Sequence, residues 1–251
     1  LDYLLKTDPD WVIGQARKYD QEHLLIKGAA NYKMKQEDQQ QYADRLIEKE
    51  KAYVVNALTL ENVFSEHALS RGTYEKLMAK NFKPALKVFQ GLPSEIAFSA
   101  RKYEEKREVL NSLPSFENLD QEKLVNRYMD QGSYDLVAGH ISRIDEAYHD
   151  SVAHRLIDQV RDDWNGGIVS EIRNFKNVKQ DVAFSLVEKG KAWAPASSPE
   201  SFPGLDHPTF VEFLLAKNHP EVLMIGAEPY WHGVASLLKY IATEDAPNIR
   251  I

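Results

Sequence analysis

A metal or acid–base centre is the first chemistry to look for, because the chain contains eight histidines and 38 acidic residues. Glu146 and His149 form an E-x-x-H pair, and His154 follows further along the same predicted helix. Di-metal helical sites need two such motifs and two further carboxylates. The sequence has no second copy and no H-E-x-x-H, so we expect these histidines to be surface or partly buried residues and predict no metal site.

Other catalytic motifs are also missing. The sequence has no G-x-G-x-x-G, no phosphate-binding G-x-x-x-x-G-K-S/T and no G-x-S-x-G nucleophile elbow. Asp162 and Asp163 precede Trp164, an arrangement that a base-excising enzyme could use, although a helix-capping aspartate explains it more simply. We therefore predict no catalytic residue and no cofactor.

The composition narrows the class of protein. The 251 residues include no cysteine, which excludes disulfides, thiolate zinc sites and cysteine nucleophiles. The net charge of −7 argues against a protein whose whole surface binds nucleic acid or anionic lipid. No apolar run reaches the length of a membrane span, and the N-terminal residues lack a signal-peptide pattern. We expect a soluble, cytoplasmic protein, and a processed or excised piece because no initiator methionine is present.

Two similar segments point to a repeat. Residues 69–81 read "LSRGTYEKLMAKN" and residues 129–141 read "MDQGSYDLVAGHI", with a glycine and then a tyrosine at matching positions. Weaker copies recur every 20 to 22 residues up to Val88 and every 28 or so from Met129. A period of this length without strand-like alternation predicts helical repeats, each a short helix, a tight turn and a second short helix.

The expected turns and aromatic positions follow from this pattern. Glycine tolerates the left-handed conformation that ends a helix, and we assign this role to Gly28, Gly72, Gly91, Gly132 and Gly190. An aromatic residue should begin each second helix and pack against the neighbouring unit, with ligand stacking as the alternative. These aromatic residues are Trp11, Tyr53, Tyr74, Tyr134, Trp164 and Trp193.

The pattern resembles the short α-helical repeats of the HEAT-like and leucine-rich-repeat-variant families. The resemblance implies an all-α fold, an α-solenoid of about 8–9 stacked helical hairpins of roughly 20–30 residues each. The variant family's cysteine cluster for an iron–sulfur centre is absent here, so the resemblance implies no cofactor. The HEAT-like class also includes alkylpurine DNA glycosylases, which hold DNA in a basic groove.

Proline and serine mark the expected boundaries. Residues 1–192 should form the repeat array, and residues 193–210 contain four prolines and should form a loop. Capping helices are expected over 211–242, followed by a tail over 243–251.

The distribution of charged residues along the sequence predicts a binding surface. The proposed second helices carry a small excess of Lys and Arg although the whole chain is acidic. We expect a mildly basic concave groove that binds an acidic segment of a protein partner, as an interaction module or scaffold subunit. The residues assigned to it are Lys76, Lys80, Arg101, Lys102, Arg143 and Arg173. The alternatives are a nucleic-acid-binding enzyme of the glycosylase type and an acidic neutraliser of a basic protein partner.

Overall fold

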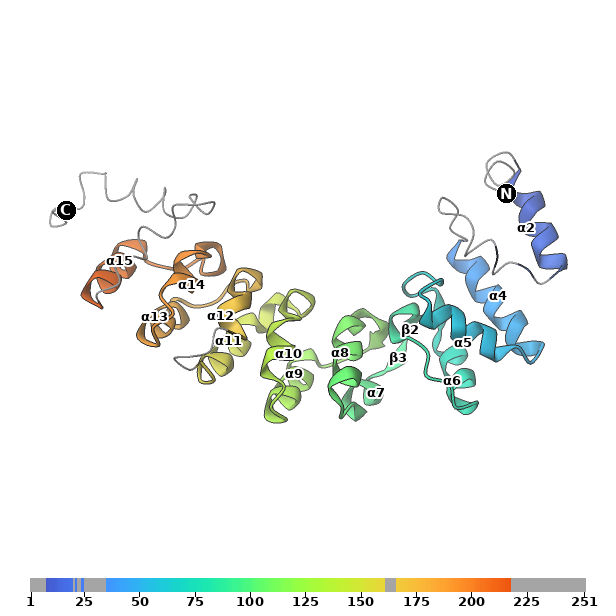
Figure 1. Cartoon of the computed structure of the whole chain (residues 1–251), viewed down its shortest axis with the longest axis horizontal. Coiled ribbons are helices and arrows are strands. Elements are labelled where there is room, and N and C mark those ends of the chain that lie inside the picture. The colour runs from blue at the N-terminus through green and yellow to red at the C-terminus, as the bar shows by residue number, and fades with distance from the viewer. Residues whose placement is uncertain (1–7, 20, 22–23, 25–34, 161–165, 218–251) are drawn as a thin grey trace. The chain divides into compact units, whose positions relative to one another are not determined.

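The computed structural model describes residues 8–19, 21, 24, 35–160 and 166–217 (Figure 1). Of these residues, 65% are helical and 4% lie in strands, which confirms the all-α prediction. The helices within the described ranges are all too short or too polar to cross a membrane. The chain divides into two compact units, Leu1–Leu119 and Asp120–Ile251, each described separately below. This division falls inside the segment 1–192 that was expected to be a single array.

Unit 1 combines helices with four two-residue strands. Its described elements are α2 (Pro9–Lys18), α4 (Gln36–Glu48), α5 (Ala52–Leu60), β1 (Leu69–Ser70), α6 (Arg71–Ala79), η1 (Leu86–Val88), β2 (Phe89–Gln90), β3 (Leu92–Pro93), α7 (Ser94–Ser99), α8 (Tyr103–Asn111), η2 (Leu113–Ser115) and β4 (Phe116–Glu117). The strands pair in parallel, Leu69 with Phe89 and Leu92 with Phe116. Helix α4 packs against α5 and α6, which places the core of this part of the unit along α4.

The regular elements of unit 2, within its described residues, are all α-helices or 3-10 turns. The elements are α9 (Gln121–Asp130), α10 (Tyr134–Ala138), η3 (Ile141–Arg143), η4 (Glu146–Tyr148), α11 (His149–Ile157), α12 (Ile168–Glu171), η5 (Ile172–Asn174), α13 (Gln180–Glu188), α14 (Trp193–Ala196), η6 (Pro199–Ser201) and α15 (His207–Ala216). Helix α11 packs on α13 and α13 on α15, while α10 packs on α12 and η5 on η6. Equivalent elements therefore contact one another from one turn of the chain to the next.

A buried apolar residue after a 3-10 turn marks each recurrence of these elements. Phe89, Phe116, Ile144, Phe175 and Phe202 directly follow η1, η2, η3, η5 and η6, at intervals of 27 to 31 residues. Each is at most 9% exposed. A short extended segment follows each 3-10 turn. The apolar side chain of its first residue is buried and anchors the segment in the core. The recurrence is thus defined by these residues and not by the glycine–tyrosine pair.

The two similar segments, 69–81 and 129–141, have different structures. Gly132 has a φ of 76° and joins α9 to α10, as predicted, and Gly190 has a φ of 70° between α13 and α14. Gly72 lies inside the first turn of α6 instead of at a helix end, so its predicted role is wrong. Asn81, with a φ of 61°, takes the left-handed position after α6. Gly28 lies outside the described residues.

The predicted shared packing role of the aromatic residues holds for only part of the series. Tyr74 is 9% exposed and meets Phe89 edge to face at 5.4 Å. Trp11, Tyr53 and Trp193 are 55%, 61% and 39% exposed, so the prediction is wrong for them. Tyr134 is half-buried and Trp164 lies outside the described residues. Each of these three residues lies in the first turn of its helix, where a side chain can face away from the neighbouring element as easily as toward it.

Residues 193–210 contain helix where a loop was expected. They include α14, η6 and the first residues of α15. Pro199 occupies the first position of η6, where no hydrogen bond from its backbone nitrogen is needed. Pro195 and Pro208 are the third residue of α14 and the second residue of α15, so each proline inside a described helix lies in its first turn, where the backbone N–H has no partner within the helix. The capping helices and tail expected after residue 217 lie outside the described residues.

Candidate functional site

The six predicted basic residues fall in both units. Lys76 lies in α6, where its Nζ is 3.7 Å from Asp44 of α4, and Lys80 follows the same helix. Arg101 and Lys102 lie immediately before α8 in unit 1. The other two, Arg143 in η3 and Arg173 in η5, are exposed residues of unit 2. The prediction that all six line one groove stays a prediction.

Two of these residues form part of a local cluster at the start of α8. The backbone N–H groups of Arg101 and Lys102 donate to the Glu105 carboxylate at 3.0 and 3.2 Å. These hydrogen bonds are the main cause of a lowered pKa of Glu105, and the charges of Lys102 and Lys83 lower the pKa further. Lys83 follows α6 in the chain and was not predicted. We call Lys83, Arg101 and Lys102 the basic cluster.

A surface of opposite charge surrounds Arg71 in the same unit. The Arg71 Nε donates to Glu75 at 2.6 Å, and this contact is the main cause of a raised pKa of Arg71. Glu117 and Glu95 raise the pKa further through their charges. Unit 1 therefore presents three carboxylates near one guanidinium on this surface, and two cations, Lys83 and Lys102, near one carboxylate at the basic cluster.

The predicted E-x-x-H histidine is a structural residue. His149 is 1% exposed, its Nε2 lies 3.1 Å from the Ile144 carbonyl, and its Nδ1 accepts the Lys176 N–H at 2.9 Å. One nitrogen must donate and the other must accept, so the geometry requires the neutral Nε2–H tautomer. Since both ring nitrogens form hydrogen bonds with backbone groups, His149 cannot also bind a metal. The described residues contain no group of three potential metal ligands.

Residues equivalent to His149 make the same kind of contact in the neighbouring turns of unit 2. Gln121 Oε1 accepts the Asp145 N–H at 3.0 Å, and Gln180 Oε1 accepts the Asp206 N–H at 3.2 Å. Each of these three side chains stands at the first position of its helix, five residues after Phe116, Ile144 or Phe175. A side chain at this position thus satisfies a backbone donor of the next extended segment and fixes the spacing between turns.

An ion pair between His154 of α11 and Asp181 of α13 connects these two helices. The His154 Nδ1 lies 2.8 Å from the Asp150 carbonyl and its Nε2 lies 2.9 Å from Asp181 Oδ2. Both nitrogens face oxygen acceptors, an arrangement that the doubly protonated ring satisfies best. The Asp181 contact is accordingly the largest cause of a raised pKa of His154, and the same contact lowers the pKa of Asp181.

This pair predicts a pH-dependent contribution to stability. The pKa of His154 is raised above its ordinary 6.5, so its contribution is complete below that pH and is lost as the pH rises through the folded-state value. The pKa of Asp181 is lowered below 3.8, so its contribution is present above that pH and is lost in stronger acid. We expect His154→Gln to reduce the free energy of unfolding at about pH 5.5, by less than about 1 kcal/mol because the pair is partly exposed, and to have less effect at about pH 8.5.

Chemical denaturation at both pH values measures this difference. The control is His140→Gln in the same unit, because the His140 Nδ1 contacts the Leu136 carbonyl at 2.8 Å instead of a carboxylate. An equal loss of stability at the two pH values for His154→Gln would show that the ion pair contributes nothing.

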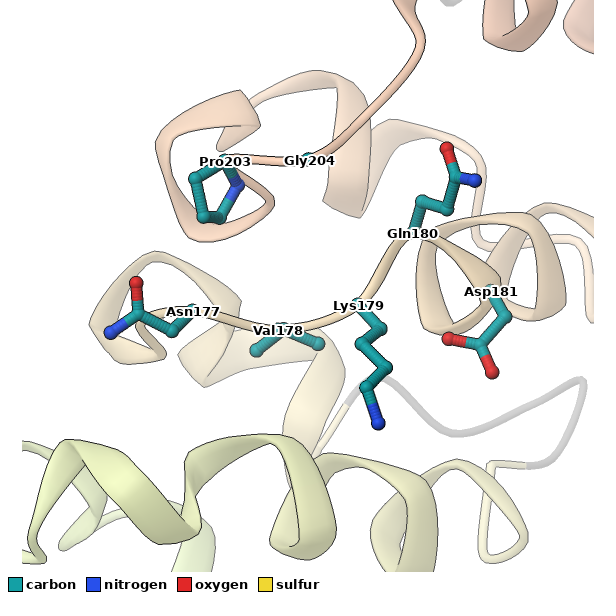
Figure 2. Close-up of a pocket in the computed structure, with 7 residues that line it drawn as sticks. All are labelled: Asn177, Val178, Lys179, Gln180, Asp181, Pro203 and Gly204. Atoms are coloured by element: carbon teal, nitrogen blue, oxygen red, sulfur yellow. The ribbon is translucent and has the colours of Figure 1, made fainter.

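A cleft of about 450 Å³ lies beside this pair (Figure 2). Figure 2 shows residues 177–181 along one side and Pro203 and Gly204 along the other. The two charged residues in its lining already have partners, since Lys179 Nζ is 3.0 Å from Asp150 and Asp181 contacts His154. The cleft therefore offers a ligand no uncompensated charge from the residues that line it, and we prefer the basic cluster as the candidate site.

The chain matches no family model, no curated protein and no solved structure.

Proposed function

We propose that this chain is a protein-interaction module, an α-solenoid of the HEAT-like kind that binds an acidic segment of a protein partner. The stacking of equivalent helices and 3-10 turns in unit 2 supports the solenoid part of this proposal. Arrays of this kind function through extended binding surfaces more often than through a catalytic centre.

The observation that carries the binding proposal is the position of Glu105. This carboxylate lies among the basic cluster, accepts two backbone N–H groups and has a lowered pKa. The side chains of all three cluster residues are exposed. The surroundings of Glu105 are thus already favourable to a carboxylate. The two cations whose charges act on Glu105, Lys83 and Lys102, exceed its charge by one, which favours a second acidic group.

Tyr103 extends this surface with an apolar contact. It follows Lys102 directly and is 55% exposed at the first position of α8. Aromatic side chains next to cations are frequent anchors of protein partners. In the proposed mode, the cations steer the acidic segment and fix its position, while Tyr103 and neighbouring apolar groups supply affinity. Lys76 and Lys80 belong to the same proposal as further cations of unit 1, and Arg143 and Arg173 are proposed as binding cations of unit 2.

Charge reversal of the basic cluster tests the proposal. We expect Lys83→Glu combined with Lys102→Glu to weaken binding of a fluorescent poly-glutamate peptide at least about tenfold, because like charges then meet across the interface. Fluorescence anisotropy at low and moderate salt measures the affinity, and circular dichroism checks the fold. The matched control, Lys18→Glu with Lys123→Glu, changes the net charge equally at exposed positions outside the cluster.

Equal weakening by both double variants would mean that net charge and not the basic cluster governs binding. A duplex DNA probe distinguishes the glycosylase-type alternative. Tighter binding of DNA than of the peptide, falling steeply as salt rises, would replace the protein-partner proposal with nucleic-acid binding.

A further inference from the structure

In two turns of unit 2, the N–H of the residue after the anchoring apolar residue joins the turn to the one before it. The N–H of Asp145 donates to Gln121 Oε1 at 3.0 Å. The N–H of Lys176 donates to His149 Nδ1 at 2.9 Å. Each acceptor is the first residue of its helix, so the same backbone donor and the same side-chain position recur.

The following turn cannot make this hydrogen bond. Pro203 directly follows the anchoring residue Phe202, and proline has no backbone N–H. Gln180, the first residue of α13, accepts instead from the N–H of Asp206 at 3.2 Å, further along the chain. The contacts between turns are therefore interrupted at Pro203.

The cleft in Figure 2 lies at this interruption. Residues 177–181 form one wall, and Pro203 and Gly204 form the other. The two turns remain joined next to the cleft, because the Val178 N–H donates to the Ser201 carbonyl at 2.9 Å. The cleft volume of about 450 Å³ is within the roughly 300–1,000 Å³ that is typical of ligand-binding sites.

The polar groups that this cleft offers to a ligand are uncharged. Lys179 and Asp181 are paired with residues of α11 and point away from the opposite wall in Figure 2. Gln180 points toward that wall, and its Oε1 has a second lone pair besides the one that Asp206 uses. The exposed Asn177 adds a second carboxamide, which can both donate and accept. A peptide main chain carries one donor and one acceptor per residue and so matches both carboxamides.

From this geometry we propose that the cleft binds the main chain of an extended peptide segment. A peptide N–H donates to Gln180 Oε1 and supplies the backbone donor that Pro203 lacks, while a peptide carbonyl accepts from Asn177 Nδ2. Because few groups take part, a short peptide binds weakly, with a Kd of about 1 mM. The site lies in unit 2 and recognises main-chain groups, so the inference is independent of the basic cluster in unit 1 and of the acidic segment proposed to bind there.

A nuclear magnetic resonance titration with acetyl-trialanine methylamide, an uncharged peptide, tests this site. We expect saturable shifts of the backbone amides of residues 177–181 and Gly204, with a Kd of about 1 mM. The same peptide with N-methylated backbone groups has no N–H donor and is expected to bind at least about threefold more weakly. The absence of a saturable shift up to about 10 mM peptide, or equal binding of the two peptides, would overturn the proposal.

Two variants test the location of the bound peptide. Asn177→Gly removes a carboxamide, and glycine readily adopts the backbone φ of 54° at this position. Gly204→Phe narrows the cleft, and a Cβ added at Gly204 meets no neighbouring group of the described residues within 4 Å, which favours an intact fold. We expect each variant to raise the Kd at least about threefold.

The matched control is Gly14→Phe, because Gly14 is an equally open glycine but lies in unit 1. This variant is expected to bind the peptide with the wild-type Kd, and circular dichroism checks that all three variants are folded. An unchanged Kd in either cleft variant, or an equal rise in the control, would show that the peptide does not bind in the cleft.

Discussion

Phe89→Ala is expected to lower the free energy of unfolding of unit 1 by about 3–5 kcal/mol, because the side chain is fully buried and its removal leaves a cavity. The ring meets Tyr74 edge to face, and the backbone of Phe89 pairs with Leu69 and contacts His67 Nδ1 at 3.1 Å. The substitution therefore affects two turns of the unit at once. Urea denaturation followed by circular dichroism measures the change.

Tyr103→Ala is the matched control for Phe89→Ala. Tyr103 is an aromatic residue of the same unit but is 55% exposed, so its removal should cost less than about 1 kcal/mol. The comparison separates the effect of burial from that of losing an aromatic ring. Similar values for the two variants would contradict the assignment of Phe89 as the residue that anchors its extended segment.

His149→Ala is expected to destabilise unit 2 by roughly 3 kcal/mol. The change removes the donor to the Ile144 carbonyl, the acceptor of the Lys176 N–H and an edge-to-face contact with Phe175 at 5.9 Å. Buried backbone groups left without partners account for most of this cost, at about 1–3 kcal/mol for each group. Thermal and urea denaturation measure the loss.

The informative companion to this variant is His149→Gln. Gln121 and Gln180 occupy the equivalent positions and accept a backbone N–H from the next turn, so glutamine should replace the Nδ1 contact. We expect His149→Gln to recover about half or more of the stability that His149→Ala loses. If the two variants are equally unstable, the ring is needed for packing and not for its hydrogen bonds.

The helical class was predictable because it depends on local pattern, whereas the register of the recurrence was not. Apolar spacing and glycine at Gly132 and Gly190 identify helices and turns directly. The anchoring residue Phe89 lies in a two-residue strand after a three-residue 3-10 turn, which is too short for either periodicity to appear. A matching glycine and tyrosine therefore seemed to align 69–81 with 129–141, although Gly72 is inside a helix and Gly132 is between two.

The candidate site was predictable only in part for a related reason. Arg101 and Lys102 attract notice as adjacent cations, and Glu105 at the third position of the next helix is a capping signal. Lys83 lies 22 residues before Glu105, and only the packing of the chain brings its charge to the same carboxylate. The role of His149 depends in the same way on Lys176, which is 27 residues away in sequence.

The contacts between neighbouring turns also determine how the chain can fold. The strand pairs join residues 20 and 24 positions apart, and the side-chain contacts of Gln121, His149 and Gln180 join residues 24, 27 and 26 positions apart. Contacts so close in sequence require little loop-closure entropy and are associated with fast folding. Within each unit, a described turn can therefore form soon after it leaves the ribosome and serve as the surface on which the next described turn condenses.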